Sequence, residues 1–360
     1  MSNKFLILSI DGGGTRGIIP ATIIQRLHQD LNNNRPITDE FDLMAGTSTG
    51  GILCTGLAYG KSPEDMVNLY LKDSKNIFFD TIWDNTRDMG TLRGANYSHK
   101  RFKNILKSYF GTDTLATIRT KLNPQDTTTS TESKRFLMVC SFDLNPTNAD
   151  QSPRNYEPRV FQSDFRRDQD ESLVDLCLKT SAGPTYFPIY DGFIDGGVAL
   201  NHPAMAAITF AMNNHSVLDG SNEYRHPDGT KKGLAKSLSD IKVLSIGTGT
   251  SGMNYIDDGQ IGNGDWGTWR WKDHIANMLT ETNMTASEYY VSNILPKDQY
   301  LRVQVNFQDY PDSILYRDFI QKNEAVDLDV KEDKHLKAMI DIANQRYEAL
   351  SDQIMNFLSN

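Results

Sequence analysis

The sequence predicts an α/β fold in which helices cover a parallel-rich central sheet. Two segments, Phe5–Ile10 and Ile241–Ile246, are mainly apolar, as strands buried on both faces of a sheet are. A glycine-rich loop follows each of them. After the first loop, Ile18–Leu31 places apolar residues three and four positions apart, which indicates an amphipathic helix. Strands that alternate with helices in this way build layered α/β proteins.

The rest of the chain continues this alternation. Phe41–Ala45 is a second apolar strand, Thr49–Tyr59 is a helix, and Ser62 is the N-cap of a third helix with proline at its first position. Further expected elements are the strands Arg135–Leu144 and Tyr300–Phe307, the helix Leu173–Leu178, and a long amphipathic helix over residues 335–358. We expect the last strand to lie nearer an edge of the sheet, because its residues alternate between apolar and polar.

Composition and charge exclude several classes of protein. The 360 residues are 38% hydrophobic and 23% charged, as in ordinary globular domains. The formal charge of −9, from 37 basic and 46 acidic residues, argues against a nucleic-acid binder that neutralises phosphates and against general attraction to anionic lipid. The polar stretches are too scattered to mark a linker. We therefore expect one domain over residues 1–360, with core motifs at 5–205 and polar loops on the surface.

The chain is expected to be a cytoplasmic protein without a signal peptide or transmembrane segment. The N-terminal apolar run is too short for a signal sequence. Leu43–Gly60 carries no charge, but its glycines, threonines and serine favour a buried strand, turn and helix over a membrane span. Cys54, Cys140 and Cys177 are odd in number and far apart, which favours buried thiols in a reducing compartment.

The segment Gly46-Thr-Ser-Thr-Gly50 lies between a predicted strand and a predicted helix. This is the pattern of a nucleophile elbow, in which Ser48 sits on a sharp turn and the flanking glycines remove side chains that would collide. The helix that follows directs the positive end of its dipole toward the reaction site. The alternative is that Ser48 is an ordinary N-cap on a glycine-rich turn.

The loop Asp11-Gly-Gly-Gly-Thr-Arg-Gly17 follows the first strand. Consecutive glycines let backbone amides approach an anion, which is either a phosphate or the oxyanion of a tetrahedral intermediate. The loop also looks like the phosphate loop of the sugar-kinase and actin superfamily, where a β-hairpin follows. Here a helix follows, which counts against an ATP-dependent phosphotransferase. That function stays as an alternative, with Gly247–Gly249 as a second glycine turn.

A third segment, Asp195-Gly-Gly197, follows Ser181–Pro188. An aspartate before two glycines is commonly only a turn. If Asp195 lies beside Ser48, its carboxylate accepts the serine proton, because partial burial raises the pKa of a carboxyl toward the useful range.

Together these segments resemble the patatin-like phospholipase family, particularly its plant-patatin-like branch. The matching motifs occur in the family's order: D-G-G-G-x-R-G at Asp11–Gly17, G-T-S-T-G at Gly46–Gly50, S-A-x-P-T-Y-F-P at Ser181–Pro188, and D-G-G-x-x-x-N-x-P at Asp195–Pro203. Leu244–Gly249 and Tyr300–Gln304 also look like this family, and the resemblance covers residues 5 to 345. Thr15 departs from it, since an aliphatic residue is more usual there.

The resemblance implies a layered patatin-type α/β/α fold and a lipid acyl hydrolase of the phospholipase A or lysophospholipase type, A2-like and metal-independent, with no cofactor. A Ser–Asp dyad is carried over to Ser48 and Asp195. The oxyanion hole is carried over to Gly12, Gly13, Gly14 and Arg16. The implied partner is a phospholipid, lysophospholipid or galactolipid at a membrane surface, reached by peripheral association, and not a nucleic acid.

Three questions stay open at this point. A triad would need a histidine; the candidates are His202, His215, His226, His274 and His335, and His202 is nearest to Asp195 in sequence. Trp266, Trp269 and Trp271 either meet a lipid–water interface or pack a loop and helix onto the core, and we favour core packing. A storage or binding protein with little activity is the alternative to an enzyme.

Overall fold

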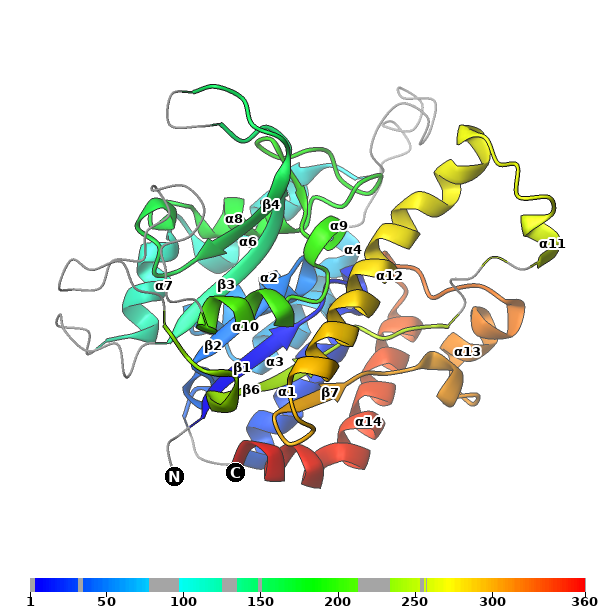
Figure 1. Cartoon of the computed structure of the whole chain (residues 1–360). Coiled ribbons are helices and arrows are strands. Elements are labelled where there is room, and N and C mark those ends of the chain that lie inside the picture. The colour runs from blue at the N-terminus through cyan, green and yellow to red at the C-terminus, as the bar shows by residue number, and fades with distance from the viewer. Residues whose placement is uncertain are drawn as a thin grey trace.

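The structure is a computed structural model that describes residues 4–31, 35–77, 97–124, 135–147, 151–212, 234–252, 256 and 258–359. A seven-stranded sheet runs through its centre in the order β4-β3-β2-β1-β6-β7, with β5 paired to β3 (Figure 1). The strands are β1 (Phe5–Ile10), β2 (Leu43–Thr47), β3 (Phe136–Asp143), β4 (Glu157–Gln162), β5 (Phe193–Asp195), β6 (Ile241–Ile246) and β7 (Tyr300–Val303).

Most strand pairs in this sheet are parallel. The pairs from β3 through β2, β1 and β6 to β7 are parallel, whereas β4 and β5 pair antiparallel with β3. The α/β fold class and the parallel-rich sheet expected from the sequence are confirmed. Parallel strands end together, so the loops after β1, β2 and β6 meet at one edge of the sheet.

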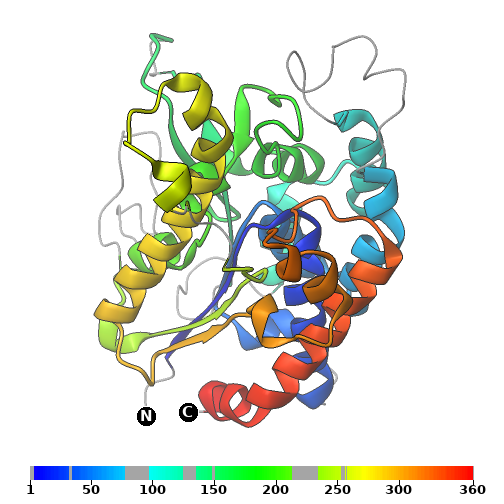
Figure 2. The same ribbon diagram turned by 90° about the vertical axis from the view of Figure 1, so that its right-hand side faces the viewer.

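Helices cover both faces of the sheet (Figures 1 and 2). One face carries α1 (Ile18–Leu31), α2 (Thr49–Tyr59), α3 (Pro63–Asn68), α4 (Ser74–Ile77), α6 (His99–Phe110), α7 (Leu115–Leu122), α8 (Leu173–Thr180), α13 (Ile314–Asp318) and α14 (Asp333–Ser359). The other face carries α9 (Gly197–Leu200), α10 (Ala204–Met212) and α12 (Thr268–Ile294), and α11 (Asp258–Ile261) precedes α12. In Figure 2, α14 runs beside α1, and α12 lies on the opposite side.

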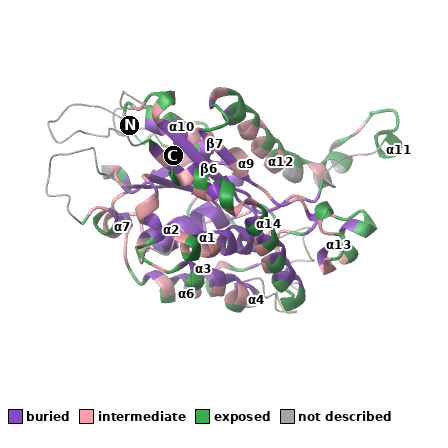
Figure 3. Cartoon of the chain, turned by 90° about the horizontal axis from the view of Figure 1, so that it is seen from below, coloured by how far each residue is buried: buried purple, intermediate pink, exposed green. Residues whose placement is uncertain are grey.

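The central strand β1 contributes to the core on both faces of the sheet, because successive side chains of a strand point to opposite sides. Leu8 and Ile10 join the larger apolar cluster with α1, α2 and α14, whereas Phe5 and Ile7 join a smaller cluster with α10 and α12. Figure 3 shows these buried strands between the two helical layers. Since five of its six residues are buried and only Leu6 is partly exposed, the sequence of β1 has no polar face.

The observed bounds of helices and strands agree with the predicted bounds where the sequence carries strong capping or turn signals. The helix Thr49–Tyr59 agrees at both ends, and Ser62 caps α3 with a capping box completed by Asp65. The strand expected at Phe41–Ala45 begins two residues later. The Asp42 carboxylate accepts the Leu6 amide at 2.7 Å, so strand pairing with β1 begins only after it.

The expected strand Tyr300–Phe307 is shorter than predicted and lies at the edge of the sheet. It ends at Val303, because the side-chain oxygen of Gln304 accepts the amides of Gly249 and Val305 in place of a regular ladder. The C-terminal helix is confirmed with slightly wider bounds than the predicted 335–358.

Cys54, Cys140 and Cys177 are free and buried, as predicted. Among the described residues, no helix has both the length and the apolar character that crossing a bilayer requires.

Candidate active site

The turn between β2 and α2 holds Ser48 in a strained backbone conformation. Its φ of 53° and ψ of −122° are rare for a residue with a side chain. A Cβ on Gly50 would overlap the carbonyl of Ile10 at the end of β1, so the turn can lie against β1 only with glycine there. The Ser48 amide donates to Oγ1 of Thr180 at 2.8 Å. The Ser48 hydroxyl makes no capping bond to α2, so the interpretation as an ordinary N-cap is wrong.

Asp195 is the partner of the Ser48 side chain. Ser48 Oγ donates to Asp195 Oδ2 at 2.6 Å, and Asp195 Oδ1 accepts the Gly197 amide at 2.7 Å. The pairing of β5 with β3, at Ser141, places Asp195 beside the elbow. Burial raises the pKa of Asp195 to about 6, against the opposing effect of the two hydrogen bonds. The carboxyl is therefore ionised at neutral pH and is a stronger base than a solvated aspartate.

The glycine loop after β1 lies directly beside the elbow. A Cβ on Gly12 would stand 3.2 Å from the Cβ of Ser48 and would overlap the side chain of Asn201. The Gly12 amide donates to the Asn201 carbonyl at 3.1 Å, and the Gly12 carbonyl accepts the Thr248 hydroxyl at 2.8 Å. Because its amide is already engaged, Gly12 does not belong with the free oxyanion donors that the family resemblance implied.

Gly13 and Gly14 carry the available amides of this loop. Neither amide has an acceptor in the described part of the chain, and both residues line the cavity that holds Ser48. Gly14 has a φ of 59°, and a Cβ there would overlap the carbonyl of Leu328. The same carbonyl accepts the Thr15 amide at 2.7 Å. The segment around Leu328 thus holds the loop at Gly14 and Thr15, and Leu328 lines the same cavity as Gly13 and Gly14.

Ser48 and Asp195 open into a cavity of about 810 Å³, which is within the range of small-molecule sites. Its lining is predominantly apolar. Leu69, Ile77, Phe102 and Phe187 line it from one layer, and Ile275 and Leu279 line it from α12. An apolar cavity with a nucleophile in its wall suits an acyl chain better than a polar metabolite.

Arg16, the basic residue of the loop, also lines the cavity. It is only 9% exposed, and its Nη1 donates to the Val326 carbonyl at 3.4 Å. Burial lowers the pKa of Arg16, and the largest opposing effect is the attraction of Glu281 of α12. Its Nε has no hydrogen-bond partner among the described residues. Arg16 therefore places a positive charge inside the cavity wall and not on the surface.

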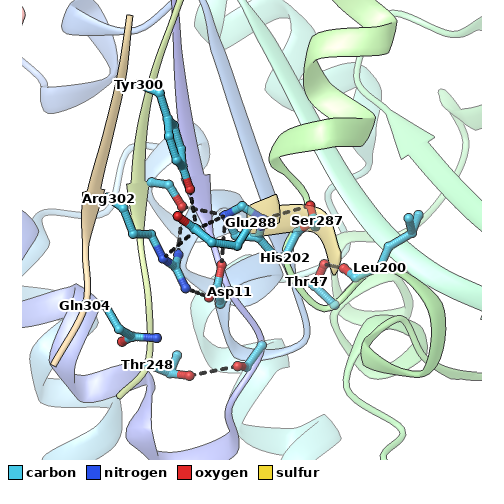
Figure 4. Close-up of polar contacts among 12 residues, drawn as sticks. Asp11, Thr47, Leu200, His202, Thr248, Ser287, Glu288, Tyr300, Arg302 and Gln304 are labelled. Carbon is cyan, nitrogen blue, oxygen red and sulfur yellow. Dashed lines mark hydrogen bonds and ion pairs between the residues drawn. The ribbon is translucent and has the colours of Figure 1, made fainter. Parts of the chain in front are cut away.

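The candidate histidines that the structure describes do not join the dyad. His202 is bound through both ring nitrogens, to Ser287 and Ser245 at 2.8 Å each, and burial lowers its pKa to about 3 (Figure 4).

Two further candidate histidines contact groups other than Asp195. The His274 ring packs on Trp266, and His335 contacts Asp318 at 2.7 Å. The other two candidates, His215 and His226, lie outside the described residues. Both Asp195 oxygens bind groups other than histidine.

The tryptophan cluster is more exposed than we expected. Trp271 is 37% exposed on α12, with its ring centroid 5.1 Å from that of Trp266. The expectation of core packing is therefore wrong for Trp271. This residue lies in the N-terminal part of α12, which extends beyond the sheet (Figure 1). The side chain of Trp269 lies outside the described residues. Ile275, Met278 and Leu279 continue the exposed apolar stripe along the same helix.

Two parts of the site were missed by sequence reasoning. The first is α12, whose residues form one wall of the cavity. The second is an ion pair between Asp11 and Arg302 behind the glycine loop. An arginine within an apolar strand was the available signal, because a charge at such a position needs a buried partner.

Several known proteins are similar to this chain. Residues 8–208 match the family model described as patatin-like phospholipase. Patatin-like protein 4 of Arabidopsis thaliana is 28% identical over 343 residues, which is 84% of this chain and 77% of that protein. A protein of Escherichia coli strain TW11681 named cGAMP-activated phospholipase is 27% identical over 374 residues, 98% of this chain and 92% of that protein. The solved structure of human GIVD cytosolic phospholipase A2 is similar at a TM-score of 0.43 and 10% identity, covering 99% of this chain and 60% of that one.

The family match spans more than half of the chain and contains the glycine loop, the elbow and Asp195. On this basis the chain belongs to the patatin-like phospholipase family.

Proposed function

We propose that this protein hydrolyses the carboxylic esters of membrane lipids with a Ser48–Asp195 dyad, as a phospholipase A2-like or lysophospholipase-type enzyme. The observation that carries the proposal is the 2.6 Å hydrogen bond between the strained serine and the aspartate, in the wall of an apolar cavity. Membership of the family supports lipid ester hydrolysis in general. The Ser48–Asp195 dyad and the type of lipid substrate are what we propose in addition.

The first half of the reaction forms an acyl-enzyme. Ser48 Oγ attacks the ester carbonyl carbon, and its proton passes to Asp195 Oδ2, which already accepts its hydrogen bond. The carbonyl oxygen gains the negative charge and accepts the amides of Gly13 and Gly14. When the tetrahedral intermediate collapses, the leaving alkoxide of the lipid takes the proton from Asp195.

The second half releases the fatty acid. Water donates a proton to Asp195 as its oxygen attacks the acyl carbon, and the same two amides stabilise the new oxyanion. Collapse breaks the bond to Ser48 Oγ, which recovers its proton from Asp195. One carboxyl serves as base and acid in both halves, and its pKa of about 6 suits both roles near neutral pH.

We propose that the protein docks on the lipid surface through the exposed apolar stripe of α12. This stripe is formed by Trp271, Ile275, Met278 and Leu279. These residues are 37–47% exposed, and two of them, Ile275 and Leu279, also line the catalytic cavity. The stripe is therefore continuous with the cavity, so a lipid that leaves the membrane meets apolar surface along its path. With a formal charge of −9, docking rests on apolar burial and not on attraction to anionic lipid.

The two alternative functions have less support. A phosphotransferase of the actin-like class needs a β-hairpin after its glycine loop, and α1 follows here. A storage or binding protein with little activity needs no serine–aspartate pair in a substrate-sized cavity, so the intact pair favours an enzyme.

The deciding experiment measures products released from vesicles of a phosphatidylcholine whose two acyl chains differ. The wild-type protein is expected to release free fatty acid, and the identity of the acid reports the cleaved position. Ser48→Ala and Asp195→Asn are expected to release none above background. Release that persists in Ser48→Ala would overturn the proposal.

Two controls make the result specific. Ser108→Ala, at an exposed position on α6, is expected to behave as wild type. Since the Escherichia coli relative is named as cGAMP-activated, each assay is run with and without cGAMP. An enzyme that depends on such an activator is then distinguished from a protein without activity, which stays inactive in both conditions.

A further inference from the structure

An ion pair lies directly behind the glycine loop. Arg302 of β7 binds the carboxylate of Asp11, the residue between β1 and Gly12. The Asp11 side chain is fully buried and that of Arg302 is 14% exposed. Figure 4 shows the guanidinium between Asp11 and the side chains of β7 and α12. Asp11 thus lies two residues before Gly13, the first of the two proposed oxyanion donors.

The guanidinium uses each of its three nitrogens on a different partner. Nη2 donates to Asp11, Nη1 donates to Ser245 Oγ at 2.7 Å, and Nε lies 3.4 Å from Glu288 Oε2. Because the guanidinium is planar and rigid, three such contacts fix its position and orientation. Asp11 is therefore held by a group that cannot itself rotate freely.

A second chain of hydrogen bonds continues from Ser245 through His202. The Ser245 oxygen accepts from Arg302, so its own hydrogen is available for His202 Nε2 at 2.8 Å. This assigns the proton of the neutral imidazole to Nδ1, which donates to Ser287 Oγ at 2.8 Å. Ser287 in turn donates to the His202 carbonyl at 2.9 Å. Every donor in this chain then has an acceptor.

The same arginine reaches the helix that forms the cavity wall. Glu288 of α12 accepts from the hydroxyl of Tyr300 and lies beside Arg302. One and two turns earlier, Met284 and Glu281 of the same helix line the cavity. One turn later, Val291 is fully buried in the core. Arg302 thus connects the glycine loop to α12 at the point where α12 passes from cavity wall to core.

We propose that Arg302 is a positioning residue for the hydrolysis: it holds Asp11, and through Asp11 it holds Gly13 and Gly14 where their amides meet the oxyanion. Asp11 is anchored by its own amide as well, which donates to the Ile246 carbonyl at 3.2 Å. The backbone bond fixes where the loop begins, and the ion pair fixes how Asp11 is turned. This inference rests on the proposed function, since it concerns the same reaction.

Loss of the guanidinium has a specific consequence. Asp11 Oδ1 has no hydrogen-bond partner among the described residues, so Arg302 supplies the contact that compensates the buried charge. Without Arg302, Asp11 must become protonated or turn toward water, because an unpaired buried carboxylate is strongly disfavoured. Either change removes the ion pair that fixes how Asp11 is turned, so Gly13 and Gly14, two and three residues further on, are held less firmly.

The chain offers a matched control for this pair. Arg159 of β4 binds Asp168, and their side chains are 16% and 0% exposed, close to the 14% and 0% of Arg302 and Asp11. The control pair is far from the glycine loop, at the opposite edge of the sheet. Both substitutions remove an arginine from a buried ion pair, and only Arg302→Gln touches the proposed oxyanion hole. Asp168 keeps Arg167 at 3.3 Å and the Gln162 amide at 2.8 Å, so Arg159→Gln is the milder of the two changes for stability.

The test uses p-nitrophenyl butyrate, a soluble ester for which membrane docking is irrelevant, and follows kcat, KM and thermal unfolding. Arg302→Gln is expected to lower kcat by about 10- to 100-fold, below the full loss of an oxyanion donor, while KM changes less than about threefold. Arg159→Gln is expected to lose some thermal stability and to keep kcat within about twofold. Arg302→Lys, which keeps the charge, is expected to recover part of the lost kcat. The rate of labelling by a fluorophosphonate, whose phosphoryl oxygen occupies the same donors, is expected to fall in parallel with kcat.

If Arg302→Gln fails to fold, Asp11→Asn tests the same ion pair from its other side. It is nearly isosteric, it is expected to lower kcat by a similar factor, and the double variant is expected to lose no more than the larger single loss. A kcat within twofold of wild type in either folded variant would overturn the inference, as would an equal kcat loss in Arg159→Gln. Ser48→Ala separates the two proposals: if it stays active the proposed function fails, and if it is inactive while Arg302→Gln is normal, only this inference fails.

Discussion

Ser48 and Asp195 are 147 positions apart in the chain, yet their side-chain oxygens lie 2.6 Å from each other. The sheet produces this approach. Ser48 follows β2, β2 pairs with β3, and β3 pairs with β5, which ends at Asp195. The five predictions below follow from this relationship and from the groups around it.

The first prediction concerns the nucleophile. Ser48→Ala is expected to lower ester hydrolysis by on the order of 10⁴-fold or more, because no other group replaces the attacking oxygen. The fold is expected to persist, since one oxygen is removed and the backbone turn is held by Thr180. Hydrolysis of p-nitrophenyl butyrate and thermal unfolding measure the two effects. Turnover at the wild-type rate would rule out Ser48 as the nucleophile.

The second prediction separates a dyad from a triad. Asp195→Asn is expected to be nearly inactive, because an amide cannot accept the Ser48 proton. His202→Ala, His215→Ala and His274→Ala are each expected to keep at least about a tenth of wild-type kcat, since a dyad needs no imidazole base. A folded histidine variant as inactive as Asp195→Asn would contradict the dyad.

The third prediction concerns pH. Asp195 acts as a base only when ionised, and burial raises its pKa to about 6. For the soluble ester, kcat/KM is therefore expected to be level above about pH 7 and to fall toward tenfold per pH unit below the pKa. The profile is measured at constant ionic strength between pH 4.5 and 9. A level profile down to pH 5 would mean that the base titrates elsewhere.

The fourth prediction concerns metal ions. Activity is expected to persist in excess EDTA, because the proposed reaction uses only Ser48, Asp195 and backbone amides. No group of three or more metal-ligating side chains is found among the described residues. Loss of turnover in EDTA with recovery on adding Ca²⁺ would contradict this expectation.

The fifth prediction concerns the lipid surface. Trp271→Ser and Met278→Ser on the exposed stripe of α12 are expected to lower activity on vesicles while activity on p-nitrophenyl butyrate stays near wild type. Added salt is expected to weaken vesicle binding little, because screening acts on charge attraction and not on apolar burial. Parallel assays with both substrates, together with vesicle co-sedimentation over a salt series, measure this.

The control for docking is Tyr156→Ser, which removes an exposed aromatic side chain outside α12 and is expected to leave both activities unchanged. Binding that requires anionic lipid and disappears at high salt would refute docking through apolar groups. Equal losses on both substrates would mean that the stripe supports the fold and not the membrane contact.

The sequence alone was sufficient for features that depend on a few neighbouring residues. The apolar runs of β1 and β6 predicted buried strands, because a strand covered on both faces has no solvent-facing side that would carry polar residues. The capping pattern at Ser62 and the glycines around Ser48 predicted local turns, since these turns are determined by short-range hydrogen bonds and steric limits. The order of the motifs was enough to indicate the family and its candidate dyad.

Only the tertiary structure decided features that depend on pairing between distant segments. It assigned the Gly12 amide to the Asn201 carbonyl, which leaves Gly13 and Gly14 as the available donors. It also placed α12 as a wall of the cavity and Arg302 behind Asp11. The residues of one segment do not determine which other segment packs against it. Strand order and helix packing depend on how the whole chain buries its apolar surface. The physical reason is that local signals specify elements, whereas a catalytic site is made of contacts between them.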